Sequence, residues 1–401
     1  MKVKDKILKN VGLMTEKNCT GCRACEQLCP VKCIKMTANN EGFLLPQVQE
    51  DVCIGCSVCV NNCPQNNKLK LNSIREVLCV KNKDDVSLSK SASGGVFPVL
   101  AEFVLENNGL VFGSTYDEEL NVLNIGIDNK DEIEKIQGSK YVQSDTKGTF
   151  TEAKIALDSG RMVLYTGTPC QIGGLKAFLR KDYDNLITAE IICHGVPSLK
   201  FFKAFLEYLN NKYGRKITGI DFRCKDRGWG NAVYRLFYKK NGKNIKKVVY
   251  TDKSSYYDAF LKGNICRKSC YSCLYARGQR IADITMGDFW GAEEFHKNFN
   301  SINGASYLSL NTEKGIRYLK AIENKFDYEK SDYKYAIKYN HNLEKPTPIS
   351  NKRDFIYEEF IKLGNNGYKI FDYDCLKPSV GIKKKITNRL PAKLRNWLKK
   401  L

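Results

Sequence analysis

Two copies of one cysteine pattern stand near the start of the chain, and they constrain its fold more than any other feature. Each copy reads C-x2-C-x2-C-x3-C-P, and the second follows the first at a constant offset of 34 residues. The first copy holds Cys19, Cys22, Cys25 and Cys29, and the second holds Cys53, Cys56, Cys59 and Cys63. Turns this tight aim three thiolates at a common point, so the repeat predicts two metal centres built on loops.

The spacing indicates iron and sulfide as the metal chemistry. In this pattern three cysteines of one copy and the fourth cysteine of the other copy bind one 4Fe–4S cluster. The prediction is one cluster on Cys19, Cys22, Cys25 and Cys63, and a second on Cys53, Cys56, Cys59 and Cys29. Paired zinc sites also use C-x2-C, but two complete copies with both prolines favour clusters. Cys33 is surplus, and we interpret it as a small buried hydrophobic residue.

The number of cysteines supports this chemistry for the whole chain. There are 17 cysteines in 401 residues, and the first residues contain no apolar stretch of signal-peptide length. Thiols in the cytosol stay reduced, so dense cysteine there indicates metal or redox chemistry and not a disulfide framework. No apolar run approaches the roughly 20 residues of a transmembrane helix. We therefore expect a cytoplasmic protein.

The charge of the chain suggests what it binds. The formal net charge of +21 favours acidic partners such as another redox protein, an anionic coenzyme or anionic lipid, although a lysine-rich solvated surface has the same composition. No nucleic-acid partner is predicted. The last 19 residues contain eight basic and no acidic residues, and Leu390, Leu394, Trp397, Leu398 and Leu401 share one helical face. This tail predicts peripheral contact with an anionic membrane, with a solvated or protein-docked helix as the alternative.

After residue 74 the sequence pattern changes to one that predicts alternating strands and helices. Strands are predicted at Val77–Val80, Leu110–Tyr116, Met162–Tyr165 and Thr188–Cys193, a helix at Ser91–Asn107, and a hairpin around Asn241-Gly242. We expect an α+β protein in which a small dicluster ferredoxin-like domain is fused to a larger mixed α/β domain. The predicted boundaries are 1–16 for an N-terminal tail, 17–73 for the ferredoxin-like domain, 74–325 for the larger domain and 326–401 for a C-terminal extension.

A second group of cysteines occurs in the larger domain. Cys170 and Cys193 follow predicted strands, and Cys266, Cys270 and Cys273 form C-x3-C-x2-C. Loops at strand ends converge on one edge of an α/β sheet, where cofactors bind. From the spacing alone, a third cluster and ordinary buried thiols remain alternative interpretations.

Several motifs of the larger domain resemble the coenzyme F420 hydrogenase/dehydrogenase beta-subunit family. They are Ser91–Phe97, Gly138–Tyr141, Gly167–Gln171 with Gly174–Lys176, Cys193–Ser198 and Ala282–Gly291. The resemblance runs from about residue 75 to 320. It implies an FAD site and, in hydrogenase-type members, a third 4Fe–4S cluster, whose ligands here would be Cys170, Cys193, Cys270 and Cys273. Cys266 departs from the pattern because it gives five candidates for four positions, and it could replace Cys270 or bind no metal.

The predicted flavin site rests on short segments of the same motifs. A helix entered through Ser93, Gly94 and Gly95 would leave backbone N–H groups free for a pyrophosphate. The chain has no G-x-G-x-x-G and no Walker lysine loop, so neither a Rossmann NAD site nor a P-loop is predicted. The candidate FAD contacts are Ser93, Gly94, Gly95, Gly138, Ser139, Lys140, Tyr141 and Thr168.

These features together predict an iron–sulfur flavoprotein oxidoreductase. It would move electrons between a hydride donor or acceptor, FAD and the clusters. The donor or acceptor would be a small molecule or a coenzyme, and reduced coenzyme F420 is one candidate. The expected partners are a redox protein or ferredoxin and a small-molecule or deazaflavin substrate. Because no catalytic acid or base can be recognised, two alternatives remain: an electron-relay subunit that serves a partner enzyme, and a ferredoxin-dependent reductase of an unidentified organic substrate.

Overall fold

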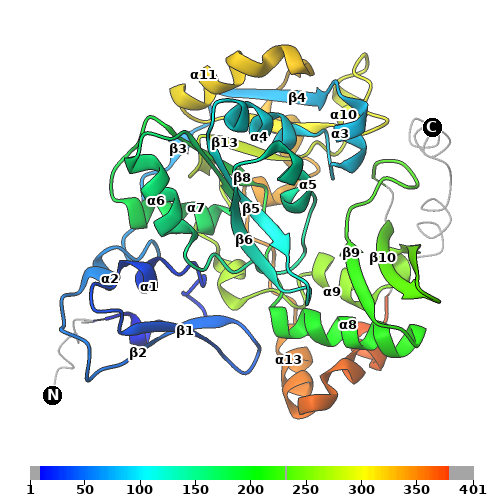
Figure 1. Cartoon of the computed structure of the whole chain (residues 1–401). Helices are drawn as coiled ribbons and strands as arrows, with labels where there is room; N and C mark the ends of the chain where they lie inside the picture. The colour runs from blue at the N-terminus through cyan, green and yellow to red at the C-terminus, as the bar shows by residue number, and fades with distance from the viewer. Residues whose placement is uncertain (1–9, 231–232, 379–401) are drawn as a thin grey trace.

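A mixed eight-stranded sheet organises the larger part of the molecule (Figure 1). The computed structural model describes residues 10–230 and 233–378. The strand order is β15 (Phe326–Lys330), β4 (Glu76–Asn82), β14 (Ser306–Leu310), β13 (Ile284–Asp288), β8 (Leu186–Ile191), β7 (Val163–Gly167), β5 (Leu110–Tyr116) and β6 (Val122–Ile127).

The central strands of this sheet decide where functional loops emerge. Strands β13, β8, β7 and β5 are parallel neighbours, whereas the remaining pairs are antiparallel. Parallel strands end at the same edge of a sheet. The loops after β7, β8 and β13 therefore open on one side, and they carry Cys170, Cys193 and Trp290.

Helices cover both faces of the sheet because successive strand residues point to opposite sides. Leu164 of β7 packs in one core with α4 (Val96–Glu106) and α11 (Glu313–Ile322). Its neighbours Val163 and Tyr165 pack in another core with α6 (Thr149–Asp158) and α7 (Pro169–Leu179). Burial of apolar residues on both faces fits the nearly continuous apolar runs of the central strands.

A smaller antiparallel sheet forms the second lobe of this region. It contains β9 (Ile217–Asp221), β10 (Val233–Lys240) and β11 (Lys243–Tyr250). The predicted hairpin is confirmed: Lys240 pairs with Lys243, and Asn241 and Gly242 turn the chain with φ of 49° and 75°. An aromatic core joins this sheet to α8 (Leu199–Tyr213), α9 (Ser255–Leu261) and α13 (Arg353–Lys362).

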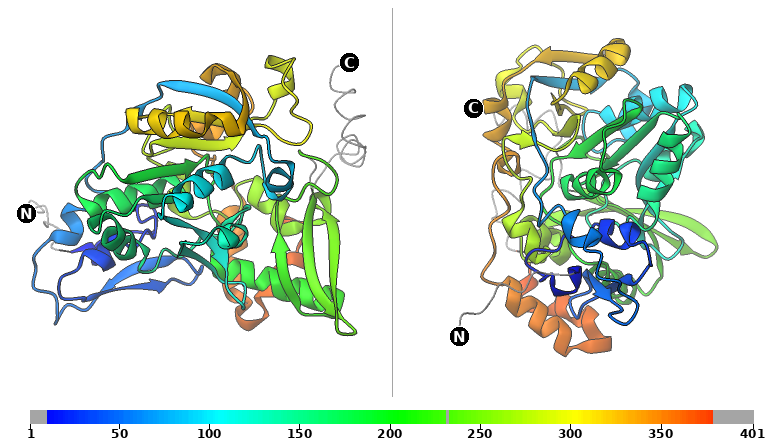
Figure 2. Two further views of the ribbon diagram at one scale, coloured as in Figure 1. Left: turned by 45° about the horizontal axis from the view of Figure 1, so that its top comes forward. Right: turned by 90° about the vertical axis from the view of Figure 1, so that its left-hand side faces the viewer.

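The N-terminal ferredoxin-type domain is small and consists mostly of loops. It contains α1 (Ala24–Leu28), the hairpin of β1 (Ile34–Ala38) with β2 (Leu44–Val48), and α2 (Val58–Asn61). It lies beside α6 and α7, as both views in Figure 2 show. β3 (Asn72–Ser73) leaves the domain and pairs with β12 (Gln279–Arg280) of the larger part.

Two sequence expectations differ from the structure. The predicted helix 91–107 begins at Val96, after α3 (Asp85–Lys90) and a loop, because Gly95 is left-handed with φ of 78° and precedes the helix as its cap. The segment after residue 325 is not a separate extension in its described part. It supplies edge strand β15 and helix α13, with the short helices α10 (Ala292–Phe295) and α12 (Tyr333–Ile337) packed nearby.

The proposed membrane-binding tail lies outside the described residues. Within the part of the chain that the structure covers, none of the helices combines the length and the apolar character that crossing a bilayer requires.

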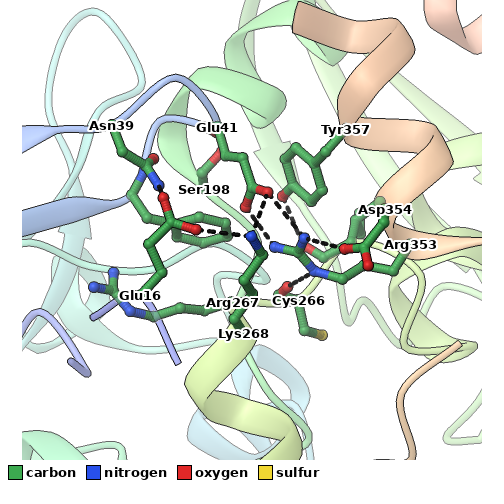
Figure 3. Close-up of polar contacts among 12 residues, drawn as sticks. Glu16, Asn39, Glu41, Ser198, Cys266, Arg267, Lys268, Arg353, Asp354 and Tyr357 are labelled. Carbon is green, nitrogen blue, oxygen red and sulfur yellow. Dashed lines mark hydrogen bonds and ion pairs between the residues drawn. The ribbon is translucent and has the colours of Figure 1, made fainter. Parts of the chain in front are cut away.

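A buried ion-pair network fastens the ferredoxin-type domain to the rest of the molecule (Figure 3). Arg353 of α13 is fully buried, and both of its terminal nitrogens donate hydrogen bonds to the carboxylate of Glu41, which lies between β1 and β2. Lys268 adds a 2.8 Å bond to Glu16, and the backbone carbonyl of Glu41 accepts a 2.6 Å bond from Ser198. Fork-shaped contacts of this kind fix orientation as well as distance.

We expect Arg353→Ala to destabilise the folded protein by about 3 kcal/mol, because it leaves the buried Glu41 carboxylate with only the more distant Lys268, at 3.6 Å, as a counterion. Anaerobic urea unfolding followed by circular dichroism measures the effect. Lys362→Ala is the matched control, since it removes an exposed pair with Glu359 on the same helix and should change stability by less than about 1 kcal/mol. Equal stability of the two variants would show that the network does not hold the domain.

Candidate functional site

The eight cysteines of the repeat line two cavities in two sets of four. The first cavity contains Cys19, Cys22, Cys25 and, from the second copy, Cys63. The second contains Cys53, Cys56, Cys59 and, from the first copy, Cys29. The crossed arrangement expected from the spacing is therefore present in the fold, and each set surrounds a space instead of meeting at a point.

The backbone repeats along with the cysteines. Gly21 and Gly55 have φ of 70° and 68°, and Arg23 and Ser57 have φ of 62° and 57°. Both pairs are separated by 34 residues, and α1 and α2 begin directly after the second pair. Left-handed residues turn the chain sharply enough to direct neighbouring thiols inward.

Cys33 also lines the second cavity, which gives this cavity five thiols. Its sulfur lies 3.4 Å from that of Cys29. Burial opposes ionisation of Cys29, but N–H groups of Cys33, Val31 and Ile34 together with the Cys33 thiol lower the pKa of Cys29. Burial raises the pKa of Cys33 to about 12. The metal ligand must be a thiolate, so the surroundings favour Cys29 over Cys33.

The second group of cysteines comes together at the open edge of the large sheet. Cys170 begins α7, Cys193 follows β8, and Cys270 and Cys273 lie in and after the 3-10 helix η4 (Lys268–Ser272). Burial raises the pKa of Cys170 to about 12, and the charges of Cys273 and Cys270 add to the rise. Burial likewise raises the pKa of Cys193, with further contributions from Cys270, Cys170 and Cys273. Four thiols from three segments thus lie within electrostatic reach of one another.

Cys266 neighbours Cys270 of this group, since both side chains pack on Gly195, and burial together with the charge of Cys270 raises the pKa of Cys266. It is completely buried in the aromatic core, and its sulfur is 2.8 Å from where a Cβ of Gly195 would stand. Its backbone N–H donates to Tyr271 and its carbonyl accepts from Arg353. Packing against Gly195 explains this thiol, so the arrangement favours Cys270 for the candidate site.

No compact single-ion site accompanies these cysteines. Within residues 10–230 and 233–378, no group of three or more His, Cys, Asp or Glu side chains is arranged to hold one metal ion. Four separated thiols around a space suit a cluster of four irons, because its ligands sit at the corners of a cube. The residues of both N-terminal sites therefore fit 4Fe–4S clusters.

One buried cation lies between the first N-terminal set and the second group. Arg267 is 2% exposed and donates to the carbonyls of Cys19 (2.7 Å) and Leu44 (2.6 Å) and to the side-chain oxygen of Gln143 (3.0 Å). Its charge lowers the pKa of both Cys170 and Cys270 against the larger effect of burial. In the described part of the chain no carboxylate pairs with it, so anionic sulfur would be its natural counterion.

The segments expected to hold a flavin meet around Arg223. This guanidinium donates to both oxygens of Asp288 (2.7 and 2.8 Å), to the hydroxyl of Tyr141 and to the carbonyl of Ala92. It also lies over the ring of Trp290 at 5.1 Å. The loop before α4 is further joined to the 137–141 segment by a 2.7 Å bond from Gln137 to Ser91.

Two lysines add to this cationic region. Burial lowers the pKa of Lys225 to about 7, although the charge of Asp288 opposes it. Burial also lowers the pKa of Lys140 to about 7, against the opposing charge of Asp221. A phosphate placed near these amines would favour their charged forms, so the region suits an anionic ligand.

The predicted glycines have different surroundings. A Cβ on Gly94 would lie 2.4 Å from the Val80 carbonyl, and the Gly94 N–H already donates to Ser306. A Cβ on Gly95 would lie 2.9 Å from Asn82. These two glycines are therefore explained by close packing on β4 and β14. Gly138, with φ of 82°, has no atom within 4 Å of its Cβ position and leaves the space free that a ligand needs.

The remaining candidates lie as follows. Ser93 donates to the carbonyl of Ala305, while its own carbonyl accepts from Lys225. Lys140 bends back to the carbonyl of Gln137 at 2.8 Å, next to half-buried Ser139. Thr168 stands apart from the Arg223 region: its hydroxyl lies 3.2 Å from the sulfur of Cys170, so it belongs to the cysteine loop.

Sequence reasoning missed Arg223 and Lys225 as site residues. They lie in a charged stretch between β9 and β10, 65 and 63 residues before Asp288. The Ala282–Gly291 motif pointed to this place through Asp288, but nothing in the sequence indicated its partner.

An aromatic series connects the Arg223 region with the second group of cysteines. The ring of Tyr141 stacks on Phe260 with centroids 4.6 Å apart, and Phe260 meets His194 edge to face at 5.1 Å. His194 follows Cys193 directly. Its ring nitrogens contact Asn342 and the Phe260 carbonyl, and burial lowers the pKa of His194, so it acts here as a neutral packing group.

Comparison with known protein families agrees with this architecture. Residues 18–67 match the 4Fe-4S dicluster domain, and residues 160–335 match the C-terminal region of the coenzyme F420 hydrogenase/dehydrogenase beta chain. The molecule thus joins a ferredoxin-type dicluster domain to a domain of the coenzyme F420 hydrogenase/dehydrogenase beta-subunit family, as the motifs predicted. The matched region begins after Ser93 and Tyr141, so the family match does not reach those flavin candidates.

Curated relatives resemble only the N-terminal domain. One component of an ion-translocating oxidoreductase complex from Methanosarcina acetivorans is 35% identical over 57 residues, which is 14% of this chain and 20% of that protein. The ferredoxin-type protein NapF of Haemophilus influenzae is 40% identical over 55 residues, 13% of this chain and 31% of that protein. The chain therefore spans less than a third of the length of either relative.

A weak structural likeness exists to a chain of the F420-reducing [NiFe] hydrogenase complex from Methanosarcina barkeri. The TM-score is 0.44 at 17% identity, over 75% of this chain and 92% of that chain.

Replacing Cys29 or Cys33 by alanine tests which of the two binds the cluster in the second cavity. Cys29→Ala should lose about four irons per chain, because it removes a thiolate ligand of one cluster. Cys33→Ala, the matched control four residues away, should keep full iron, because Cys33 stands outside the four-cysteine pattern of the repeat. Iron and sulfide assays on anaerobically purified protein measure this. Loss of iron from Cys33→Ala alone would reverse the assignment.

Proposed function

We propose that this protein is an iron–sulfur flavoprotein oxidoreductase that exchanges electrons between a hydride donor or acceptor and a one-electron carrier. The observation that carries the proposal is the placement of Tyr141, Phe260 and His194, which join a cationic ligand region to a group of four cysteines. The substrate class is a small molecule or coenzyme that gives or takes a hydride, with the deazaflavin coenzyme F420 as the leading candidate from the family.

FAD is the ligand we propose for the Arg223 region. Lys225 and Lys140 would bind its phosphates, because buried amines gain most from an anion that completes their charge. Arg223, although paired with Asp288, would add its positive charge beside them. The open backbone at Gly138 would allow close approach, and Trp290 and Tyr141 offer flat apolar surfaces for rings. When bound, a flavin supplies two-electron hydride chemistry, and clusters supply one-electron transfer.

The four cysteines Cys170, Cys193, Cys270 and Cys273 would bind a third 4Fe–4S cluster. Their thiols are held protonated by burial, so loading must release protons. Arg267 favours that ionisation at two of the four positions. Cys22 of the first N-terminal site packs with Cys170 and Cys273 in one core, so the third site would adjoin the first.

The second N-terminal site is the one that meets solvent. Cys56 is exposed, and Ile54 beside it is 65% exposed. Val31, which lines the same cavity as Ile54, is 36% exposed, and an exposed apolar surface at a redox site suits brief docking of another protein. A redox partner protein or ferredoxin would therefore exchange electrons at this end. The same exposure supports the alternative function, an electron-relay subunit of a partner enzyme, if no flavin binds.

The iron content tests the third cluster. Wild-type protein should hold about twelve irons and twelve sulfides, and Cys170→Ala should lose about four of each while keeping the N-terminal pair. Cys266→Ala is the control in the same region, because its thiol packs against Gly195, and it should keep full iron. Saturation of the wild type near eight irons would mean that Cys170, Cys193, Cys270 and Cys273 are ordinary thiols.

Flavin binding tests the ligand region. Anaerobic titration with FAD should show binding to the wild type, and Arg223→Gln should weaken it about 10- to 100-fold, since a charge-assisted contact contributes about 1.5–3 kcal/mol. Arg235→Gln is the control. It removes a guanidinium on β10 that pairs with Asp221 and Asp226, and this variant should bind FAD normally. Iron content verifies that both variants fold.

Mixing the FAD-loaded protein with reduced coenzyme F420, NADH or reduced ferredoxin in separate cuvettes then identifies the donor. Bleaching of flavin absorbance by F420 alone would support a deazaflavin dehydrogenase, whereas bleaching by ferredoxin alone would support a ferredoxin-dependent reductase. If the wild type with full clusters binds no FAD, the oxidoreductase proposal fails and the relay function takes its place.

A further inference from the structure

Tyr275 is a buried phenol that lies between two groups of cysteines. It is 4% exposed, and within the described residues its hydroxyl has no hydrogen-bond partner. The cysteines that act on its phenol electrostatically are Cys170 and Cys273 of the second group and Cys22 and Cys63 of the first N-terminal set. Buried hydroxyl groups normally find a partner, so this one calls for an explanation.

Helix α7 brings Tyr275 and these cysteines together through a pair of glycines. A Cβ on Gly173 would stand 2.2 Å from the Tyr275 hydroxyl oxygen, and a Cβ on Gly174 would stand 3.0 Å from the Cys22 sulfur. Cys170 begins the same helix three and four positions earlier, so it shares their face. Tyr275 and Cys22 therefore touch adjacent residues of α7, one turn from Cys170.

The glycine pair is unfavourable for a helix unless something needs the space. Alanine at Gly173 would clash with the Tyr275 phenol, and alanine at Gly174 would clash with Cys22. Both side chains belong to a packed core that cannot easily move. The two glycines thus keep the ferredoxin-type domain and the Tyr275 hydroxyl close to Cys170.

We propose that Tyr275 is a positioning residue of the junction between the two cysteine sites, where its hydroxyl donates a hydrogen bond to a sulfur of the loaded Cys170, Cys193, Cys270 and Cys273 site. A phenol is a donor at neutral pH, and cluster sulfurs are anionic acceptors. Hydrogen bonds to the sulfurs stabilise the more negative reduced form and raise the reduction potential. The inference rests on the third cluster proposed above.

Redox titration of anaerobic full-length protein, followed by low-temperature EPR, tests this role. Tyr275→Phe should keep full iron and shift the reduction equilibrium of one cluster about tenfold toward the oxidised form, which is about 59 mV lower for a one-electron couple. Tyr307→Phe is the matched control: it removes another buried tyrosine hydroxyl, on β14, and should leave every potential unchanged.

The results separate the two proposals. Twelve irons in the wild type with no shift in Tyr275→Phe would overturn the role of Tyr275 and leave the third cluster standing. Equal shifts in Tyr275→Phe and Tyr307→Phe would also overturn it, because the effect would then come from general loosening of the core. A wild type that saturates at eight irons would overturn the third cluster and, with it, this role of Tyr275.

Discussion

Two buried guanidinium groups fix the position of the ferredoxin-type domain against the larger part of the molecule. Arg267 reaches from the segment before η4 to the carbonyls of Cys19 and Leu44, and Arg353 holds Glu41 at the end of the β1 hairpin. A small loop-rich domain with little core of its own cannot keep a fixed orientation by apolar packing alone. The two guanidinium groups fix the orientation, because their directional hydrogen bonds form in only one arrangement of the partners.

The sequence predicted the parts of the fold that short-range patterns encode. The cysteine repeat, the Asn241-Gly242 hairpin and strand Leu110–Tyr116 depend on neighbouring residues, and the structure contains all three. The role of β15 could not be predicted, since its pairing with β4 joins residues about 250 positions apart. The start of α4 at Val96 was missed for a similar reason: its loop is held by contacts with distant β14.

The same distinction applies to the candidate site. The eight cysteines of the repeat indicate their grouping through their spacing, whereas Cys170, Cys193, Cys270 and Cys273 were grouped through the family resemblance, with Cys266 as a fifth candidate. Arg223 and Tyr275 have no motif, and their importance comes from neighbours that the fold supplies: Asp288 for one, Gly173 for the other. Gly94 and Gly95 show the converse, because a pattern suggestive of phosphate binding is accounted for by close packing of the chain on two strands.

In the proposed function, helix α7 would set the order in which the sites exchange electrons. Its first turn carries Cys170, its glycine pair contacts Cys22, and its cap residue Thr168 lies against the Cys170 sulfur. The Arg223 region contacts the Cys193 side of this group through Phe260 and His194, whereas the N-terminal set that includes Cys56 reaches solvent. Electron transfer weakens steeply with distance, so the proposed cofactors would form one route: from the Arg223 region through the second cysteine group and the Cys22 set to the surface at Cys56. A hydride site at the interior end and a protein-docking site at the exposed end would keep the two chemistries apart.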